Sequence, residues 1–195
     1  MRLLLALAIL LLTPALAFAH TGTGHTVGFV HGFEHPIGGL DHVLAMIAVG
    51  VFAFVLGGRA LILVPLSFVA MMVLGFALGI AQVELPFVEL GIALSSVVIG
   101  AAAATGRPMP VAVAMALVGL FAIFHGHAHG AEMPADNSGL AYAAGFISAT
   151  ALLHLVGIGA SAGVARLIGH YGKPVAQLAG GVFALAGIGI LAGWL

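Results

Sequence analysis

Long apolar stretches alternate with short polar breaks along most of the chain. The breaks carry the glycine, proline and charged residues that are typical of helix ends. Each stretch has about the length that an α-helix needs to cross a bilayer. The pattern predicts an all-α membrane protein, a bundle of six transmembrane helices. The predicted spans lie at about residues 40–57, 60–82, 86–104, 109–125, 139–165 and 174–195.

The N-terminal segment has a different pattern, with a short positively charged start and an apolar core over residues 3–12. Residues 17–19 read Ala-Phe-Ala, the small-x-small form of a signal peptidase site. We therefore expect a cleavable signal peptide over 1–19 and a single polytopic membrane domain over 20–195. Cleavage before His20 would add the amine and imidazole of that residue as further ligands. An uncleaved first helix is the alternative, and the short apolar run disfavours it.

The charged residues are distributed unevenly between the predicted loops. With the mature N-terminus outside, each basic residue of the mature chain falls in the cytoplasm, as the positive-inside rule requires. These residues are Arg59, Arg107, Arg166 and Lys173. The acidic residues fall outside and are Glu34, Asp41, Glu84, Glu89, Glu132 and Asp136. We predict a bacterial inner-membrane protein whose mature N-terminus and histidine-rich segments face the periplasm, where carboxylates attract cations.

Composition restricts the partners. The chain is 63% hydrophobic and only 6% charged, whereas about a quarter of the residues of a typical soluble domain are charged. We therefore expect the lipid bilayer to be its main environment. Five Lys and Arg residues cannot form a nucleic-acid surface, and without cysteine there is no thiolate metal site. The chain has no Walker-type loop, so we expect it not to bind ATP. We also expect no prosthetic group. Glycines spaced four apart, such as Gly75 and Gly79, predict close helix packing; homo-oligomer formation stays open.

The first candidate cluster lies at the start of the first predicted span. Pro36 suits the first turn of a helix, so the helix should begin there, with Asp41 and His42 one turn further in and His35 able to fold back. Met46 shares a face with His42. Further candidates near the aqueous edge are His31 and Glu34. Ionisable groups at membrane depth are unfavourable unless they are paired or functional, so an Asp41–His pair that only ties helix ends is the alternative.

The second candidate cluster is FAIFHGHAHGAEMP, residues 121–134. On a helix, His125, His129 and Glu132 share one face, while His127 points elsewhere. The alternative is a histidine-rich loop in water. In the predicted topology this segment and the first cluster lie on the same side of the membrane.

A third candidate, His154, lies about 22 Å along the fifth predicted helix at about 1.5 Å per residue. A histidine at that depth is by default a candidate functional residue. The alternative is a neutral imidazole bonded to a hydroxyl such as Ser95 or Ser96. His170 falls in the last cytoplasmic loop, where we expect it to be solvated.

The two clusters offer imidazoles and carboxylates without thiolates. That donor set suits a borderline divalent ion such as Ni²⁺, Co²⁺ or Zn²⁺ and fits Cu(I) poorly. The residues alone do not choose among these ions.

Two ordered motifs carry a resemblance to a known family. Residues 35–42 read HPIGGLDH and residues 124–132 read FHGHAHGAE. They are similar to the motifs His-Pro-x-x-Gly-x-Asp-His and Phe-His-Gly-x-Ala-His-Gly-x-Glu of the HupE/UreJ family of nickel/cobalt permeases. The resemblance extends over the signal peptide and the six spans.

The resemblance implies uptake of Ni²⁺, or Co²⁺ in some members, for maturation of metalloenzymes such as hydrogenase or urease. The functional residues that it implies are His35, Asp41, His42, His125, His129 and Glu132. His127 occupies a variable position of the motif.

The favoured function is a secondary permease for a divalent metal ion, rather than an enzyme. One rival is an intramembrane zinc-dependent hydrolase, in which such residues would hold Zn²⁺ and activate water; the absence of a His-Glu-x-x-His motif weakens it. The other is a membrane metal-binding accessory protein that does not transport. The choice of ion and the coupling of uptake to a proton gradient or to facilitated diffusion stay open.

Overall fold

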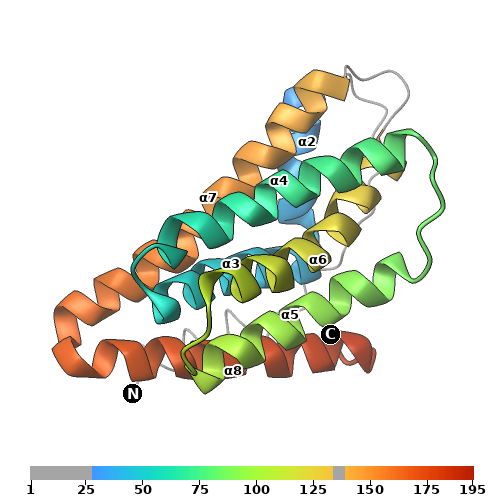
Figure 1. Cartoon of the computed structure of the whole chain (residues 1–195). Coiled ribbons are helices and arrows are strands. Elements are labelled where there is room, and N and C mark those ends of the chain that lie inside the picture. Colours follow the sequence, from blue (N-terminus) through green and yellow to red (C-terminus); the bar gives the residue numbers. More distant parts are fainter. Residues whose placement is uncertain (1–27, 134–138) are drawn as a thin grey trace.

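The computed structural model describes residues 28–133 and 139–195, and within these ranges the secondary structure is helical without a strand. The helices are α2 (Gly28–Gly38), α3 (Leu40–Leu56), α4 (Ala60–Ile80), α5 (Val88–Thr105), α6 (Val111–Ala131), α7 (Gly139–Ile168) and α8 (Gly172–Leu191), with the short 3₁₀ helix η1 (Gly169–Tyr171) between the last two. Figure 1 shows their arrangement. The predicted signal peptide and His20 lie outside the described residues.

Four helical segments of the described chain are long and apolar enough to cross a membrane: α4, α5, α6 and the stretch Gly139–Leu191 that contains α7 and α8. A fifth candidate is the pair α2 and α3, which is bent by 84°. The prediction of an all-α membrane protein is therefore confirmed, whereas the count of six spans stays a prediction. Figure 1 shows α7 and α8 as separate rods that meet at η1.

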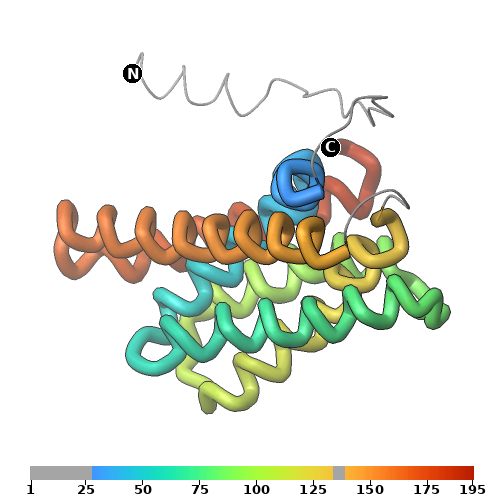
Figure 2. Tube along the Cα trace, turned by 90° about the horizontal axis from the view of Figure 1, so that it is seen from above, coloured from blue at the N-terminus to red at the C-terminus, as the bar shows by residue number. Residues whose placement is uncertain are grey.

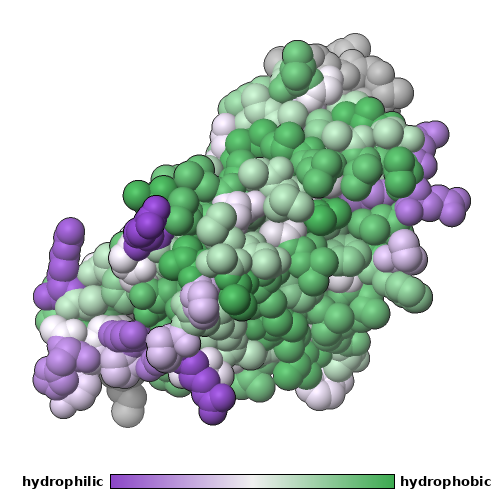
Figure 3. Space-filling view, in the orientation of Figure 1, coloured by the Kyte–Doolittle hydropathy of each residue, from purple (hydrophilic) through white to green (hydrophobic). Residues whose placement is uncertain are grey.

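The visible surface has the polarity of a protein in a bilayer. In Figure 3, apolar residues cover most of the face, and hydrophilic residues gather toward its two ends. Large apolar side chains are exposed along the helices, among them Ile62, Leu155, Leu178 and Leu185. An apolar surface of this extent is typical of contact with lipid.

Small residues allow α4 and α6 to pack closely. A Cβ on Gly126 of α6 would collide with the Met72 carbonyl oxygen of α4, and one on Gly75 would collide with the Ile123 carbonyl oxygen. Gly79 likewise faces the backbone of α6. The predicted packing role of the Gly75 and Gly79 pair is confirmed. Backbone contact is the use that membrane helices make of such spacing.

The predicted start of the first helix near Pro36 is wrong. Pro36 is buried in the last turns of α2, which ends at Gly38, and α3 begins at Leu40. Gly39 between them has extended backbone angles, φ −100° and ψ 120°. Two adjacent glycines set the boundary because glycine has a low helix propensity. Figure 2 shows α2 nearly end-on while most of the other helices are seen from the side.

The predicted fourth span ended at residue 125, but α6 continues to Ala131. Glycine usually weakens a helix, yet the helix persists through Gly126 and Gly130. Both glycines lie against the backbone of α4, where a larger side chain would collide. Tertiary packing thus compensates for low propensity, and His125, His127 and His129 all lie on one regular helix.

Candidate metal-ion site

Four histidines from two segments that are far apart in sequence meet where α2, α3 and α6 converge. The ring centroids of His42 and His125 lie 4.7 Å apart, those of His42 and His129 5.0 Å, and those of His35 and His129 5.0 Å. We call His35, His42, His125 and His129 the histidine cluster. The bend between α2 and α3 lets His35 and His42 both reach α6, with their own centroids 6.5 Å apart.

Two of the predicted carboxylates, Asp41 and Glu132, each pair with one of these rings. The Asp41 carboxylate accepts hydrogen bonds from the His42 ring through Nδ1, at 3.0 Å, and from the His42 backbone N–H, at 2.8 Å. Glu132, just beyond the end of α6, lies 3.0 Å from His35 through Oε2 and Nε2. A carboxylate that holds one imidazole nitrogen orients the ring and leaves the other nitrogen for a ligand.

The pairing also sets the charge of Glu132, which is half exposed. Its hydrogen bond with His35 lowers the pKa of the Glu132 carboxyl, against the opposing effect of partial burial. The carboxylate is thus negative beside the histidine cluster over a wider pH range than a free glutamate.

A second contact fixes the tautomer of His125. The Ser95 hydroxyl donates to the Ile92 carbonyl oxygen, so its oxygen is free to accept from His125 Nε2–H at 2.9 Å. The lone pair of a neutral His125 ring then lies on Nδ1, and this atom is buried without a hydrogen-bond partner. A neutral imidazole with an available lone pair is the form that binds a metal ion.

Unpartnered buried nitrogens are concentrated in this region of the described chain. They are His42 Nε2, His125 Nδ1, both ring nitrogens of His129 and both of His154. A buried polar atom without a partner costs about 1–3 kcal/mol, so several together favour a site that a ligand completes. In the described residues, however, no group of three or more His, Asp or Glu side chains is arranged to hold a metal ion.

His154 is buried outside the cluster, and the Phe68 ring contacts both His154 and His125. The Phe68 ring centroid is 5.6 Å from that of His125 and 5.1 Å from that of His154. The predicted alternative, in which Ser95 or Ser96 bonds His154, is wrong. Ser95 bonds His125, and Ser96 donates to the Ala93 carbonyl oxygen.

The remaining candidates lie around the cluster rather than in it. Met46 is buried, and its sulfur accepts a hydrogen bond from Thr150 at 3.3 Å. The His31 ring meets the edge of Tyr142, with centroids 5.7 Å apart, and Glu34 is exposed. His127 points away, as predicted, and bonds the Val83 carbonyl oxygen at 2.8 Å.

Sequence spacing gave no indication of several neighbours of the cluster. Phe146 of α7 stacks on His129, with centroids 5.0 Å apart and planes at 13°. Tyr142, one turn earlier, lies 6.1 Å from His35 between ring centroids and has a buried hydroxyl without a partner. Phe68 is also an ordinary residue of an apolar helix, and Ser95 was expected only as a partner of His154. Only the packing of α4, α5 and α7 against α3 and α6 brings these four side chains to the site.

Comparison with known proteins agrees with the motifs. The sequence model described as "HupE / UreJ protein" matches residues 7–190. The chain is also 45% identical over 180 residues to "Protein HupE" of Rhizobium leguminosarum bv. viciae, and the match covers 92% of each chain. No solved structure matches the chain. The resemblance inferred from residues 35–42 and 124–132 is confirmed: the chain belongs to the HupE/UreJ family.

Proposed function

We propose that this protein is a secondary transporter that imports a divalent transition-metal ion, Ni²⁺ or Co²⁺, for maturation of a metalloenzyme such as hydrogenase or urease. The observation that carries the proposal is the set of unpartnered imidazole nitrogens at His42, His125 and His129. Asp41 and Glu132 supply negative charge beside them. The resemblance to nickel/cobalt permeases supports this choice of ion.

The proposed topology has six spans, in which α2 and α3 together form the first and α7 and α8 count separately. Arg59, Arg107, Arg166 and Lys173 then lie on the cytoplasmic side, in keeping with the positive-inside rule. The histidine cluster opens to the periplasm of a bacterial inner membrane. A helix broken at the binding site, as at Gly38 and Gly39, is a recurring feature of secondary transporters.

The proposed path begins between Glu132 and His35, at the periplasmic end. An ion loses part of its water shell to the carboxylates and then binds imidazoles of the cluster after side-chain rotation. The Phe68 ring contacts both His125 and His154, and in the proposed path the ion passes it to reach His154. Few and exchangeable ligands suit transport, because a site that binds too tightly cannot release its ion.

A non-transporting metal-binding protein would use the same residues, so the decisive test is transport. The purified full chain in proteoliposomes should accumulate radioactive nickel. Excess Co²⁺ should compete strongly, and Zn²⁺ is tested as the third competing ion. His42→Ala in matched vesicles should bind and transport poorly. Metal binding by the wild type without accumulation would reject the transporter and leave the accessory role. Hydrolytic activity that requires added Zn²⁺ would instead support the intramembrane enzyme.

A further inference from the structure

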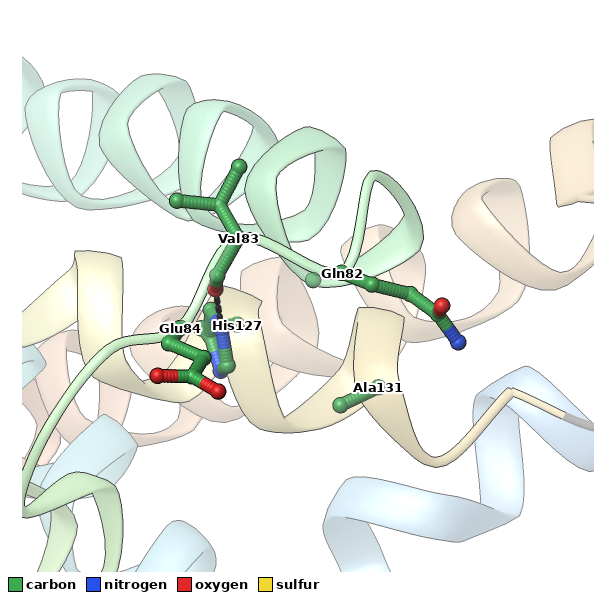
Figure 4. Close-up of a pocket in the computed structure, with 6 residues that line it drawn as sticks. Gln82, Val83, Glu84, His127 and Ala131 are labelled. Carbon is green, nitrogen blue, oxygen red and sulfur yellow. Dashed lines mark hydrogen bonds between the residues drawn. The ribbon is translucent and has the colours of Figure 1, made fainter.

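A separate pocket lies on the side of α6 that faces the loop between α4 and α5. His127 projects into it, away from the histidine cluster, and Figure 4 shows its ring bonded to Val83. The pocket has a volume of about 240 Å³ and is lined by Gly79, Gln82, Val83, Glu84, His127 and Ala131. An adjoining hollow of about 540 Å³ is again lined by His127 and Glu84, with Leu85 and Pro86.

The bond to Val83 determines which tautomer a neutral His127 adopts. A carbonyl oxygen only accepts hydrogen bonds, so Nε2 carries the proton at a donor distance of 2.8 Å. The lone pair therefore lies on Nδ1, which is buried and has no hydrogen-bond partner. An imidazole that donates one N–H to a backbone carbonyl while the other nitrogen stays free is the usual arrangement of a metal-ligating histidine.

Glu84 supplies a carboxylate to the same space. It is exposed in the loop after α4 and lines both hollows together with His127. In Figure 4 the Glu84 and His127 side chains lie on the same side of the loop, whereas Gln82 points away from them. One imidazole and one carboxylate form a donor pair for a borderline divalent cation.

We propose that this pocket is a second cation site, in which His127 Nδ1 and the Glu84 carboxylate bind a divalent transition-metal ion and water completes its shell. The identity of the ion as Ni²⁺ or Co²⁺ rests on the proposed function. With two protein ligands the site binds more weakly than the cluster and exchanges faster. Because His127 lies on the same turns of α6 as His125 and His129, the site holds ions beside the entrance.

Two substitutions test whether His127 and Glu84 are metal ligands or only structural residues of the pocket. His127→Gln keeps an amide N–H at about the place of Nε2, which can still donate to Val83, but removes the Nδ1 lone pair. Glu84→Gln removes the charge at nearly constant shape. Gln82→Asn is the matched control, because it lies in the same pocket and asparagine tolerates the positive φ of 54° found there.

The experiment measures equilibrium binding of radioactive nickel to the full chain in detergent, with size-exclusion chromatography as the check on folding. The wild type and Gln82→Asn should show a tight and a weak class of sites. His127→Gln and Glu84→Gln should weaken only the weak class, by roughly 10–100-fold. His42→Ala should weaken the tight class and leave the weak one.

Absence of the weak class from the wild type would overturn the second site and leave His127 as a structural contact with the loop. Retention of the weak class in either His127→Gln or Glu84→Gln would do the same. Failure of transport in proteoliposomes with the weak class present would instead reject the proposed function alone. Binding in detergent and accumulation in vesicles therefore distinguish the two failures.

Discussion

Asp41 is predicted to control metal binding by holding His42 rather than by its charge alone. Its Oδ1 atom accepts from both the ring and the backbone of His42, at 3.0 and 2.8 Å. A hydrogen bond to a charged group contributes about 1.5–3 kcal/mol. Loss of the ring bond in Asp41→Ala would then reduce affinity for Ni²⁺ by roughly 10–100-fold, at about 1.4 kcal/mol for each tenfold.

Asp41→Asn is the matched variant. Its amide oxygen can still accept from His42 Nδ1–H without a negative charge, so the ring keeps its orientation, and the loss should be smaller, about tenfold or less. Equilibrium binding of radioactive nickel in detergent measures both, and uptake into proteoliposomes should fall in the same order. His170→Ala is the control and should be silent, since His170 is exposed in η1 at the other end of α7.

Two results would refute this reasoning. Wild-type affinity in a folded Asp41→Ala protein would mean that the orientation of His42 does not matter for the ion. Equal losses in Asp41→Asn and Asp41→Ala would mean that charge, and not the held ring, is the contribution of Asp41. A comparable loss in His170→Ala would contradict a metal site at the end of the molecule that holds the histidine cluster.

Three further predictions test other levels of the structure. Apparent affinity for Ni²⁺ should fall at acidic pH, because protons compete with the ion for neutral imidazoles; the lowered pKa of Glu132 keeps that carboxylate ionised to a pH below the usual glutamate range, so an equilibrium titration that stays flat down to that range would exclude the histidines as ligands. Gly126→Ala should lower thermal stability in detergent by about 1–3 kcal/mol through its collision with Met72, whereas Gly159→Ala, with open space around it, should not. Intact mass should show a mature chain that begins at His20, and retention of Arg2 would contradict the signal peptide.

The sequence predicted the helix faces that carry the site residues better than it predicted how far α6 extends. Helix spacing placed His125 and His129 on one face and His127 on another, which the structure confirms, because a regular helix fixes these directions locally. The continuation of α6 through Gly126 and Gly130 could not be predicted from propensity. It depends on the backbone of α4, which is remote in sequence.

The environment of His154 shows the same limit. The sequence placed this residue at membrane depth and offered Ser95 or Ser96 as its partner. Either serine was a reasonable partner, because both lie side by side on the same apolar helix, α5. Which histidine meets Ser95 depends on how α5 and α6 are rotated against each other, and that rotation follows from the packing of glycines and apolar side chains along both helices.

The low charge of the chain and its buried imidazoles are parts of one physical arrangement. A site for an ion within a membrane protein needs ligands that lose little when they are dehydrated, and a neutral imidazole meets this condition better than a carboxylate. The carboxylates therefore lie at the edge, where Asp41 and Glu132 are partly exposed, and each orients a ring that reaches inward. The break at Gly38 and Gly39 makes this geometry accessible, because a straight helix would separate His35 from His42 by about 10 Å along its axis. Bending the chain there brings both rings against α6.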